Sequence, residues 1–436
     1  MKDYLITDNK YRKRNLIMIL IIINFSIISN KQFKDQRKLN EITQISIIVN
    51  GTGNQSILNG IEFNNHFYNN TPSYILINGV IQNYTGIVAY NLEDPENNIT
   101  MIWDHLLTNC ELMFFKLYNI TKIEFINFDT SEVTTMYGMF YECISITSLN
   151  LNNFDTSKVQ IMDAMFYYCI SLKSLDLSNF NTSSVISMNS LFGNCKELTS
   201  LDLSNFDTSL VKEMYYMFYG CESLKYLNVS SFITSSVTDM MGVFSYCYSL
   251  TSLDLSNFDT SSVTIMQRMF FDCSSLISLK INFTTPNVKN FESMFYNCIS
   301  LISLDLYNFN ASSADIYDIF VNINDNLILC INEENNPNII SYLSLQNPNY
   351  YNNCSDICFN KTIKIKINEN NTCSFDCIND EVYKFEYKNM CYESCPNGTH
   401  NSFSNNLICE EDNIDDIIEN NICNKSCSVI NFLNNK

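Results

Sequence analysis

A repeat of 26 residues dominates the middle of this sequence. The pair Met139-Phe140 recurs as Met165-Phe166 and, two intervals later, as Met217-Phe218. The stretch LTSLDLSNFDTS occurs twice without change, at 198–209 and at 250–261. A fixed period of this length predicts a solenoid, in which each unit buries its apolar side only against its neighbours.

Each unit begins with a leucine pattern that predicts a short strand. In 171–177 the residues Leu172, Leu175 and Leu177 follow the order L-x-x-L-x-L. Successive side chains of a strand alternate between its two faces. We therefore expect Leu175 and Leu177 to point into the solenoid and the polar residues between them to point outward.

The second half of each unit predicts a short helical piece. Val185, Met188 and Phe192 share one side of a helix at this spacing, which favours a short helix or 3₁₀ segment. Thr182 and Ser183 precede it and are residue types that cap the first backbone donors of a helix. The fold expected is thus α/β, a solenoid with a parallel sheet on one side and short helical segments on the other.

One column of the repeat holds cysteine. A disulfide ladder or a row of metal ligands is the alternative to a buried core position, but the same column holds Leu117 at its start and Ile323 at its end. A position that accepts Leu and Ile favours the core, where cysteine packs as a small hydrophobe. The predicted core cysteines are Cys143, Cys169, Cys195, Cys221, Cys247, Cys273 and Cys298.

The complete unit SLTSLDLSNFDTSSVTIMQRMFFDC, at 249–273, resembles the repeat of BspA-like leucine-rich-repeat surface proteins. The resemblance extends over 113–323, about half of the chain. It implies a leucine-rich-repeat solenoid displayed outside the cell and a role in adhesion to matrix or to cells. The unit at 278–288 lacks one residue, and 322–332 abandons the motif, which is typical of a terminal cap.

Two further modules are expected before the repeats. A basic patch at 10–14 runs into the apolar stretch 16–28, which predicts a signal peptide or a signal anchor within 1–30. Residues 40–112 contain strand-like runs, including a hairpin signal at Asn78-Gly79. We expect a small β-rich module at 40–112 that caps the solenoid of 113–332; an independent ligand-binding domain is the alternative.

Residues 333–436 are expected to form a Cys-rich extracellular module. The segment contains four C-x₃-C pairs. In a secreted chain, cysteines at this spacing predict disulfides that replace a hydrophobic core. Zinc is the alternative, but this segment holds a single histidine, His400, and lacks the C-x₂-C spacing typical of zinc sites. The disulfide candidates are Cys330, Cys354, Cys358, Cys373, Cys377, Cys391, Cys395, Cys409, Cys423 and Cys427. Cys110 belongs to neither set.

Glycosylation is a hypothesis that rests on sequons alone. The N-x-S/T sites include Asn83, Asn98, Asn119, Asn181, Asn228, Asn310, Asn360 and Asn397.

Charge and histidine content exclude several function classes. The formal net charge is −20, which argues against nucleic-acid partners and against docking on an anionic membrane. The three histidines, His66, His105 and His400, lie outside the repeats, and no phosphate-binding glycine loop is present. We expect no enzyme, no cofactor and no metal, with membrane contact only through an N-terminal anchor.

The outward side of the predicted strands is the candidate working surface. This surface carries one row of mostly serine and one row of mostly acidic side chains. The acidic row would recruit Ca²⁺ or a basic partner; a solvated face without a ligand is the alternative. The candidate ligand-binding residues are Asp176, Asp202, Tyr226, Asn228, Asp254, Asp305 and Tyr307. The function expected is extracellular or cell-surface binding of a protein or glycan ligand, and the resemblance implies that this binding is adhesive. A self-associating coat protein is the alternative.

Overall fold

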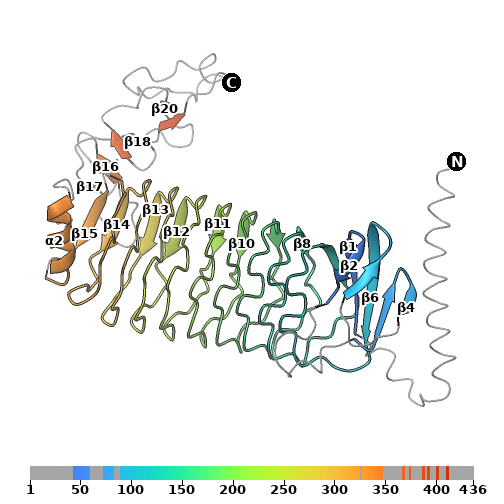
Figure 1. Ribbon diagram of the computed structural model, residues 1–436. Coiled ribbons are helices and arrows are strands. Elements are labelled where there is room, and N and C mark those ends of the chain that lie inside the picture. Colours follow the sequence, from blue (N-terminus) through green and yellow to red (C-terminus); the bar gives the residue numbers. More distant parts are fainter. Residues whose placement is uncertain are drawn as a thin grey trace, which may run out of the picture.

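The described part of the chain is an elongated solenoid with an antiparallel sheet at its N-terminal end and a helix at its C-terminal end (Figure 1). The computed structural model describes residues 43–58, 72–82, 89–324, 327–332 and 334–346, together with short strands between 366 and 411. Within these residues the protein is mostly sheet and turn, with very little helix.

The solenoid strands lie parallel, one per repeat, over about seven turns. Their pairing is in register at one repeat length, so that Leu201 lies beside Leu227 and Leu253 beside Leu279. The strands form three hydrogen-bonded groups, β8–β9, β10–β11 and β12–β15. Their bounds are β8 (Ser148–Leu149), β9 (Ser174–Leu175), β10 (Ser200–Asp202), β11 (Tyr226–Asn228), β12 (Ser252–Leu255), β13 (Ser278–Ile281), β14 (Ser303–Leu306) and β15 (Ile328–Ile331).

The helical piece predicted after each strand is not formed; residues 188–195 are a chain of turns. Ser190 and Asn194 have φ angles of 54° and 58°, opposite in sign to those of an α-helix. Instead of closing helical bonds, alternate amides reach the next repeat, as where the Phe192 N–H donates to the Met217 carbonyl at 2.9 Å. The apolar spacing fits this turn chain as well as it fits a helix, because in both the same residues face the core.

The capping prediction for Thr182 is also wrong. Its hydroxyl donates to the Asp207 carbonyl at 2.8 Å and accepts the Asp207 N–H at 2.8 Å, so that it bridges two repeats. Local capping comes from the preceding residue, since the Asn181 side chain accepts the Ser183 N–H at 3.1 Å. The same threonine bridge recurs along the solenoid at Thr130, Thr156, Thr208 and Thr285.

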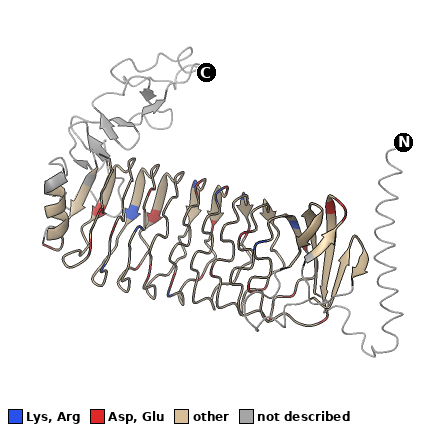
Figure 2. Cartoon of the chain, viewed as in Figure 1, with Lys and Arg blue, Asp and Glu red and all other residues tan. Residues whose placement is uncertain are grey.

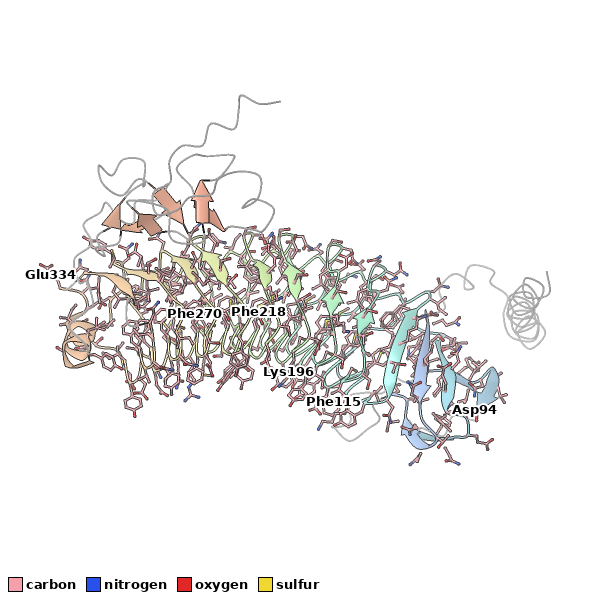
Figure 3. The ribbon with its side chains drawn as sticks, turned by 90° about the horizontal axis from the view of Figure 1, so that it is seen from above. Asp94, Phe115, Lys196, Phe218, Phe270 and Glu334 are labelled. Atoms are coloured by element: carbon pink, nitrogen blue, oxygen red, sulfur yellow. The ribbon has the colours of Figure 1, made fainter. Side chains whose placement is uncertain are left out.

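A continuous stack of nine phenylalanine rings fills the interior. Neighbouring ring centroids lie 5.5–5.7 Å apart and the rings are nearly parallel. The rings are Phe114, Phe140, Phe166, Phe192, Phe218, Phe244, Phe270, Phe295 and Phe320, all buried, and Figure 3 labels Phe218 and Phe270. The solenoid core is therefore one uninterrupted cluster rather than a series of separate ones.

The N-terminal sheet joins the solenoid edge to edge. β7 takes the strand position of the first repeat, because Ile120, Ile123 and Phe125 stand two repeats before Leu172, Leu175 and Leu177. β1 pairs antiparallel with β7 and covers the backbone edge that the parallel strands leave open. The strand order is β4-β3-β6-β1-β7, with β2 and β5 forming a separate pair. The bounds are β1 (Thr43–Asn50), β2 (Gly53–Ser56), β3 (Tyr74–Ile77), β4 (Val80–Gln82), β5 (Ala89–Leu92), β6 (Glu96–Trp103) and β7 (Ile120–Phe125).

The hairpin predicted at Asn78-Gly79 is confirmed. β3 and β4 pair directly across it, with Ile77 opposite Val80. Asn78 and Gly79 have φ angles of 49° and 83°, the backbone region in which these two residue types are favoured.

The C-terminal end of the solenoid is covered by α2 (Pro337–Gln346). Ile339 and Leu343 of α2 are buried in the solenoid core, so this core continues past residue 332. The buried Asn336, just before α2, donates to the Phe309 carbonyl at 3.0 Å and ties the helix to the last full turn. Farther along the chain lie β16 (Lys366–Asn368), β17 (Cys373–Ser374), β18 (Phe385–Tyr387), β19 (Met390–Tyr392), β20 (Thr399–Asn401) and β21 (Cys409–Glu411).

The predicted signal segment at 1–30 lies outside the described residues. No helix within the described ranges has both the length and the apolar character needed to cross a membrane.

Replacing Thr208 by valine is expected to lower the free energy of unfolding by about 1–3 kcal/mol. The hydroxyl accepts the Ile233 N–H at 2.8 Å and donates to the Ile233 carbonyl at 2.9 Å, and both backbone groups lose their partner when it is removed. Urea denaturation followed by circular dichroism measures the change. Thr199→Val, at an exposed threonine, is the matched control and should change stability by less than about 0.5 kcal/mol.

Replacing Phe218 by alanine is expected to cost about 3–5 kcal/mol, because it removes one ring from the middle of the stack and leaves a cavity between two others. The same denaturation experiment measures it, with the exposed Tyr226→Ala as control. Equal stability losses in the two variants would show that the stack is not a principal source of stability.

Candidate ligand-binding face

The outward side of β8 to β14 forms a narrow polar face, which we call the strand face. Its first row is Ser148, Ser174, Ser200, Tyr226, Ser252, Ser278 and Ser303, and its second row is Asn150, Asp176, Asp202, Asn228, Asp254, Lys280 and Asp305. Parallel register places members of a row side by side, as with Ser200 beside Tyr226 and Asp202 beside Asn228. Neighbouring strands are about 4.8 Å apart, so each row is a ladder of closely spaced side chains.

The acidic side chains of the second row also terminate the strands. The Asp176 carboxylate accepts the Ser178 N–H at 3.0 Å, and that of Asp202 accepts the Ser204 N–H at 3.0 Å. These backbone hydrogen bonds lower the pKa of both carboxyl groups. The carboxylates therefore stay ionised near neutral pH and serve the turn and the surface at once.

Charges alternate toward the C-terminal end of the second row, where Figure 2 shows red, blue and red on β12, β13 and β14. Lys280 lies between two acidic neighbours and pairs with Asp254 at 2.9 Å. Burial raises the pKa of Asp254, but hydrogen bonds from Ser256 and Lys280 outweigh it and leave the pKa lowered. Burial raises the pKa of Asp305, only partly offset by the Tyr307 N–H.

Two aromatic side chains interrupt the polar pattern but are not brought together. Tyr226 lies on β11 in the serine row and is 56% exposed. Tyr307 is 48% exposed and lies in the turn after β14, where its N–H donates to Asp305 at 2.9 Å. Three repeats separate the two tyrosines, so a ligand that touches both must extend along the face. Asn228, also predicted here, donates its side-chain amide to Asp202 at 2.9 Å.

The seven cysteines of the repeat column are fully buried. Each thiol donates to the carbonyl of a phenylalanine one repeat earlier, at 3.0–3.3 Å. Burial raises the pKa of Cys169, Cys221 and Cys273 to about 12. These thiols are therefore unreactive at neutral pH and serve the core.

The remaining cysteines have different surroundings. Cys110 is buried, and burial strongly raises its thiol pKa. Cys330 is buried in β15, inside the solenoid rather than in a separate module. Cys373, Cys391 and Cys409 lie on β17, β19 and β21, but their side chains, and all of Cys354, Cys358, Cys377, Cys395, Cys423 and Cys427, lie outside the described residues. In the described part of the chain no three His, Cys, Asp or Glu side chains gather closely enough to hold a metal ion.

Sequence reasoning missed a second surface, on the turn side of the solenoid. Half-buried rings follow the Met-Phe position in most repeats; Gly193 takes this position in one repeat, and Tyr246 lies one residue further on in another. We call this set the aromatic band: Phe115, Tyr141, Tyr167, Tyr219, Tyr246, Phe271 and Tyr296. Neighbouring rings touch, with centroids 4.8 Å apart for Tyr141 and Tyr167 and 4.7 Å apart for Phe271 and Tyr296. The repeated aromatic residue directly after Met-Phe was the available signal.

The buried cysteines are expected to resist alkylation in the folded protein. At pH 8 iodoacetamide should leave the seven column thiols unmodified and should modify them in urea, because thiolate is the reactive form. Peptide mapping by mass spectrometry measures the modification at each site. Modification of Cys221 without denaturant would contradict its burial.

The free energy of unfolding is also expected to fall as the pH rises from about 8.5 toward 12. The unfolded chain releases its thiol protons from about pH 8.5, whereas the folded state retains those of Cys169, Cys221 and Cys273 up to about 12.

The model of one protein family, described as "Mycoplasma protein of unknown function, DUF285", matches residues 108–227 and 221–327. The two matches together span 108–327, just over half of the chain, and coincide with the parallel-strand solenoid. A comparison with curated proteins gives no match. The chain therefore belongs to the DUF285 family.

Proposed function

We propose that this protein is a secreted or cell-surface binding protein that holds a protein or glycan ligand on its strand face. The observation that carries the proposal is Tyr226, an aromatic side chain 56% exposed in the serine row. Its ring has no role in the core, and exposed aromatic residues of this kind commonly anchor interfaces. The proposal includes an adhesive role, which the resemblance to BspA-like leucine-rich-repeat surface proteins suggests.

The surroundings of Tyr226 suit an extended polar ligand. Lys225 and Tyr226 are exposed neighbours, and the paired Asp202 and Asn228 side chains lie beside them in the second row. A tyrosine ring flanked by hydroxyl, carboxylate and ammonium groups offers stacking together with hydrogen bonds of both polarities. Such a set fits the hydroxyl groups of a glycan or the backbone of a polypeptide.

The flanking modules belong to the same proposal. An N-terminal signal segment at 1–30 would deliver the chain to the secretory route, where the sequons and the Cys-rich module of 333–436 would acquire glycans and disulfides. The leucine-rich-repeat assignment remains part of the proposal as well. It is supported by the L-x-x-L-x-L strand motif and by parallel in-register pairing.

Binding of the purified protein to matrix proteins, glycan arrays and intact cells tests the proposal. Tyr226→Ala with Asp202→Asn is expected to weaken saturable binding at least tenfold, because it removes a central anchor and its neighbouring charge. The asparagine can still accept the Ser204 N–H, so the turn after β10 is kept.

Tyr317→Ala is the matched control, since Tyr317 is 67% exposed but lies on the turn side. Equal binding by both variants and the wild type would remove the strand face from consideration. Ordered self-assembly in the absence of any bound ligand, measured by light scattering and electron microscopy, would favour a coat protein instead.

A further inference from the structure

The aromatic band is a surface that the proposed function does not use. Its rings are half-buried, with one side on the core and the other open to solvent. Tyr216 extends the band sideways, with its centroid 5.2 Å from that of Tyr219 and 6.0 Å from that of Tyr215. The chain passes close beneath these rings, since a Cβ on Gly242 would lie 2.4 Å from the Tyr216 ring. The rings thus form two contiguous groups, Phe115 to Tyr167 and Tyr215 to Tyr296, separated by the repeat that has Gly193 at this position.

Two of the protein's own cations lie on rings of this band. Lys116 lies 4.9 Å from the centroid of the Phe115 ring and 3.9 Å from the Glu142 carboxylate. Arg268 lies 5.6 Å from the centroid of the Phe271 ring and pairs with Glu292 at 3.3 Å. In both cases a cation rests on a ring of the band while a glutamate of the next repeat neutralises it.

The middle of the band, around Tyr215, also offers a ring with nearby carboxylates, while the charges of Lys196 and Arg268 act on the neighbouring rings of Tyr219 and Tyr216. Burial raises the pKa of the Tyr215 hydroxyl most. The next largest contributions come from the negative charges of three nearby carboxylates, those of Asp163, Glu213 and Asp239. Among the described residues no lysine or arginine pairs with any of these three. Asparagine and serine donors fix two of them instead: Asp163 accepts from the Ser187 hydroxyl at 2.6 Å, and Glu213 accepts from the Asn189 amide at 3.0 Å.

We propose that this region, Asp163, Glu213, Tyr215, Tyr219 and Asp239, docks an extended protein segment that carries arginine or lysine side chains. Charge complementarity is the argument for this occupant, together with the Lys116 and Arg268 arrangements on the same surface. The three carboxylates are spread over about 14 Å, three strand spacings, which is too wide for one metal ion or one small organic cation.

The repeat also defines the spacing of the partner's cations. Two repeats advance about 9.6 Å along the solenoid. Three residues of a segment in the polyproline II conformation advance about 9.3 Å and return the side chain to the same side. A segment with a basic residue at every third position therefore presents one cation to every second repeat. This surface lies on the turn side, so its occupation is independent of the ligand proposed for the strand face.

Fluorescence anisotropy with a labelled peptide of repeated Arg-Ser-Ser units tests the proposal. Tyr215→Leu with Tyr219→Leu is expected to raise the Kd about tenfold, because two ring contacts with cations are lost while the net charge is unchanged. A peptide of Gln-Ser-Ser units should not bind. Unaltered denaturation midpoints would show that the variant is folded.

The matched control is Tyr226→Leu with Tyr307→Leu, which makes the same chemical change on the strand face and should leave the Kd unchanged. Equal affinity of the Tyr215/Tyr219 variant and the wild type would overturn the proposal, since the net charge of −20 alone would then explain binding. An equal loss in both double variants would overturn it as well. If the first variant does not fold, Glu213→Gln at an exposed side chain replaces it, with an expected loss of about threefold.

Discussion

The architecture depends on a match between two repeat distances, that of the backbone and that of the phenylalanine stack. Parallel strands pair at about 4.8 Å, whereas the centroids of the stacked rings are 5.5–5.7 Å apart. The difference is accommodated when the rings are displaced sideways, which is also the arrangement that their quadrupoles favour. Backbone pairing, ring stacking and the threonine bridge of Thr208 therefore all require the same register. A shift of one residue would break all three.

The solenoid and its inward-facing residues could be predicted from the sequence because every repeat has the same pattern of apolar positions. Leu201 and Phe192 are buried as expected, since alternation and periodicity report which side of the chain faces the core. The helical piece was wrong because periodicity does not report the backbone conformation. Glycine, asparagine and serine at the left-handed positions, as at Gly220 and Ser190, were a signal for turns. In other repeats the equivalent positions hold arginine or tyrosine, which hid this signal for turns.

The candidate surfaces were only half predictable. Strand alternation was sufficient to place Asp202 and Tyr226 on an outward face, but it gave no sign that Asp202 also terminates β10. The aromatic band was missed because a ring after Met-Phe looks like one more core residue in a single repeat. Its exposure depends on how far the chain turns at Tyr168 and Tyr246, whose φ angles are positive. That conformation is set by hydrogen bonds between repeats, which a single unit does not contain.

The two surfaces differ in how far they can vary without loss of the fold. In a solenoid, stability is approximately a sum of local terms between neighbouring units, so a change at one exposed position stays local. Core columns such as that of Cys221 must then be similar in every repeat, and they carry no information about a ligand. Specificity has to reside where repeats depart from the common pattern. On the strand face these departures are Tyr226, Lys280 and Tyr307. On the turn side they are the carboxylates around Tyr215, which pair with no lysine or arginine in the part of the chain that the structure describes and which the proposed basic partner would neutralise.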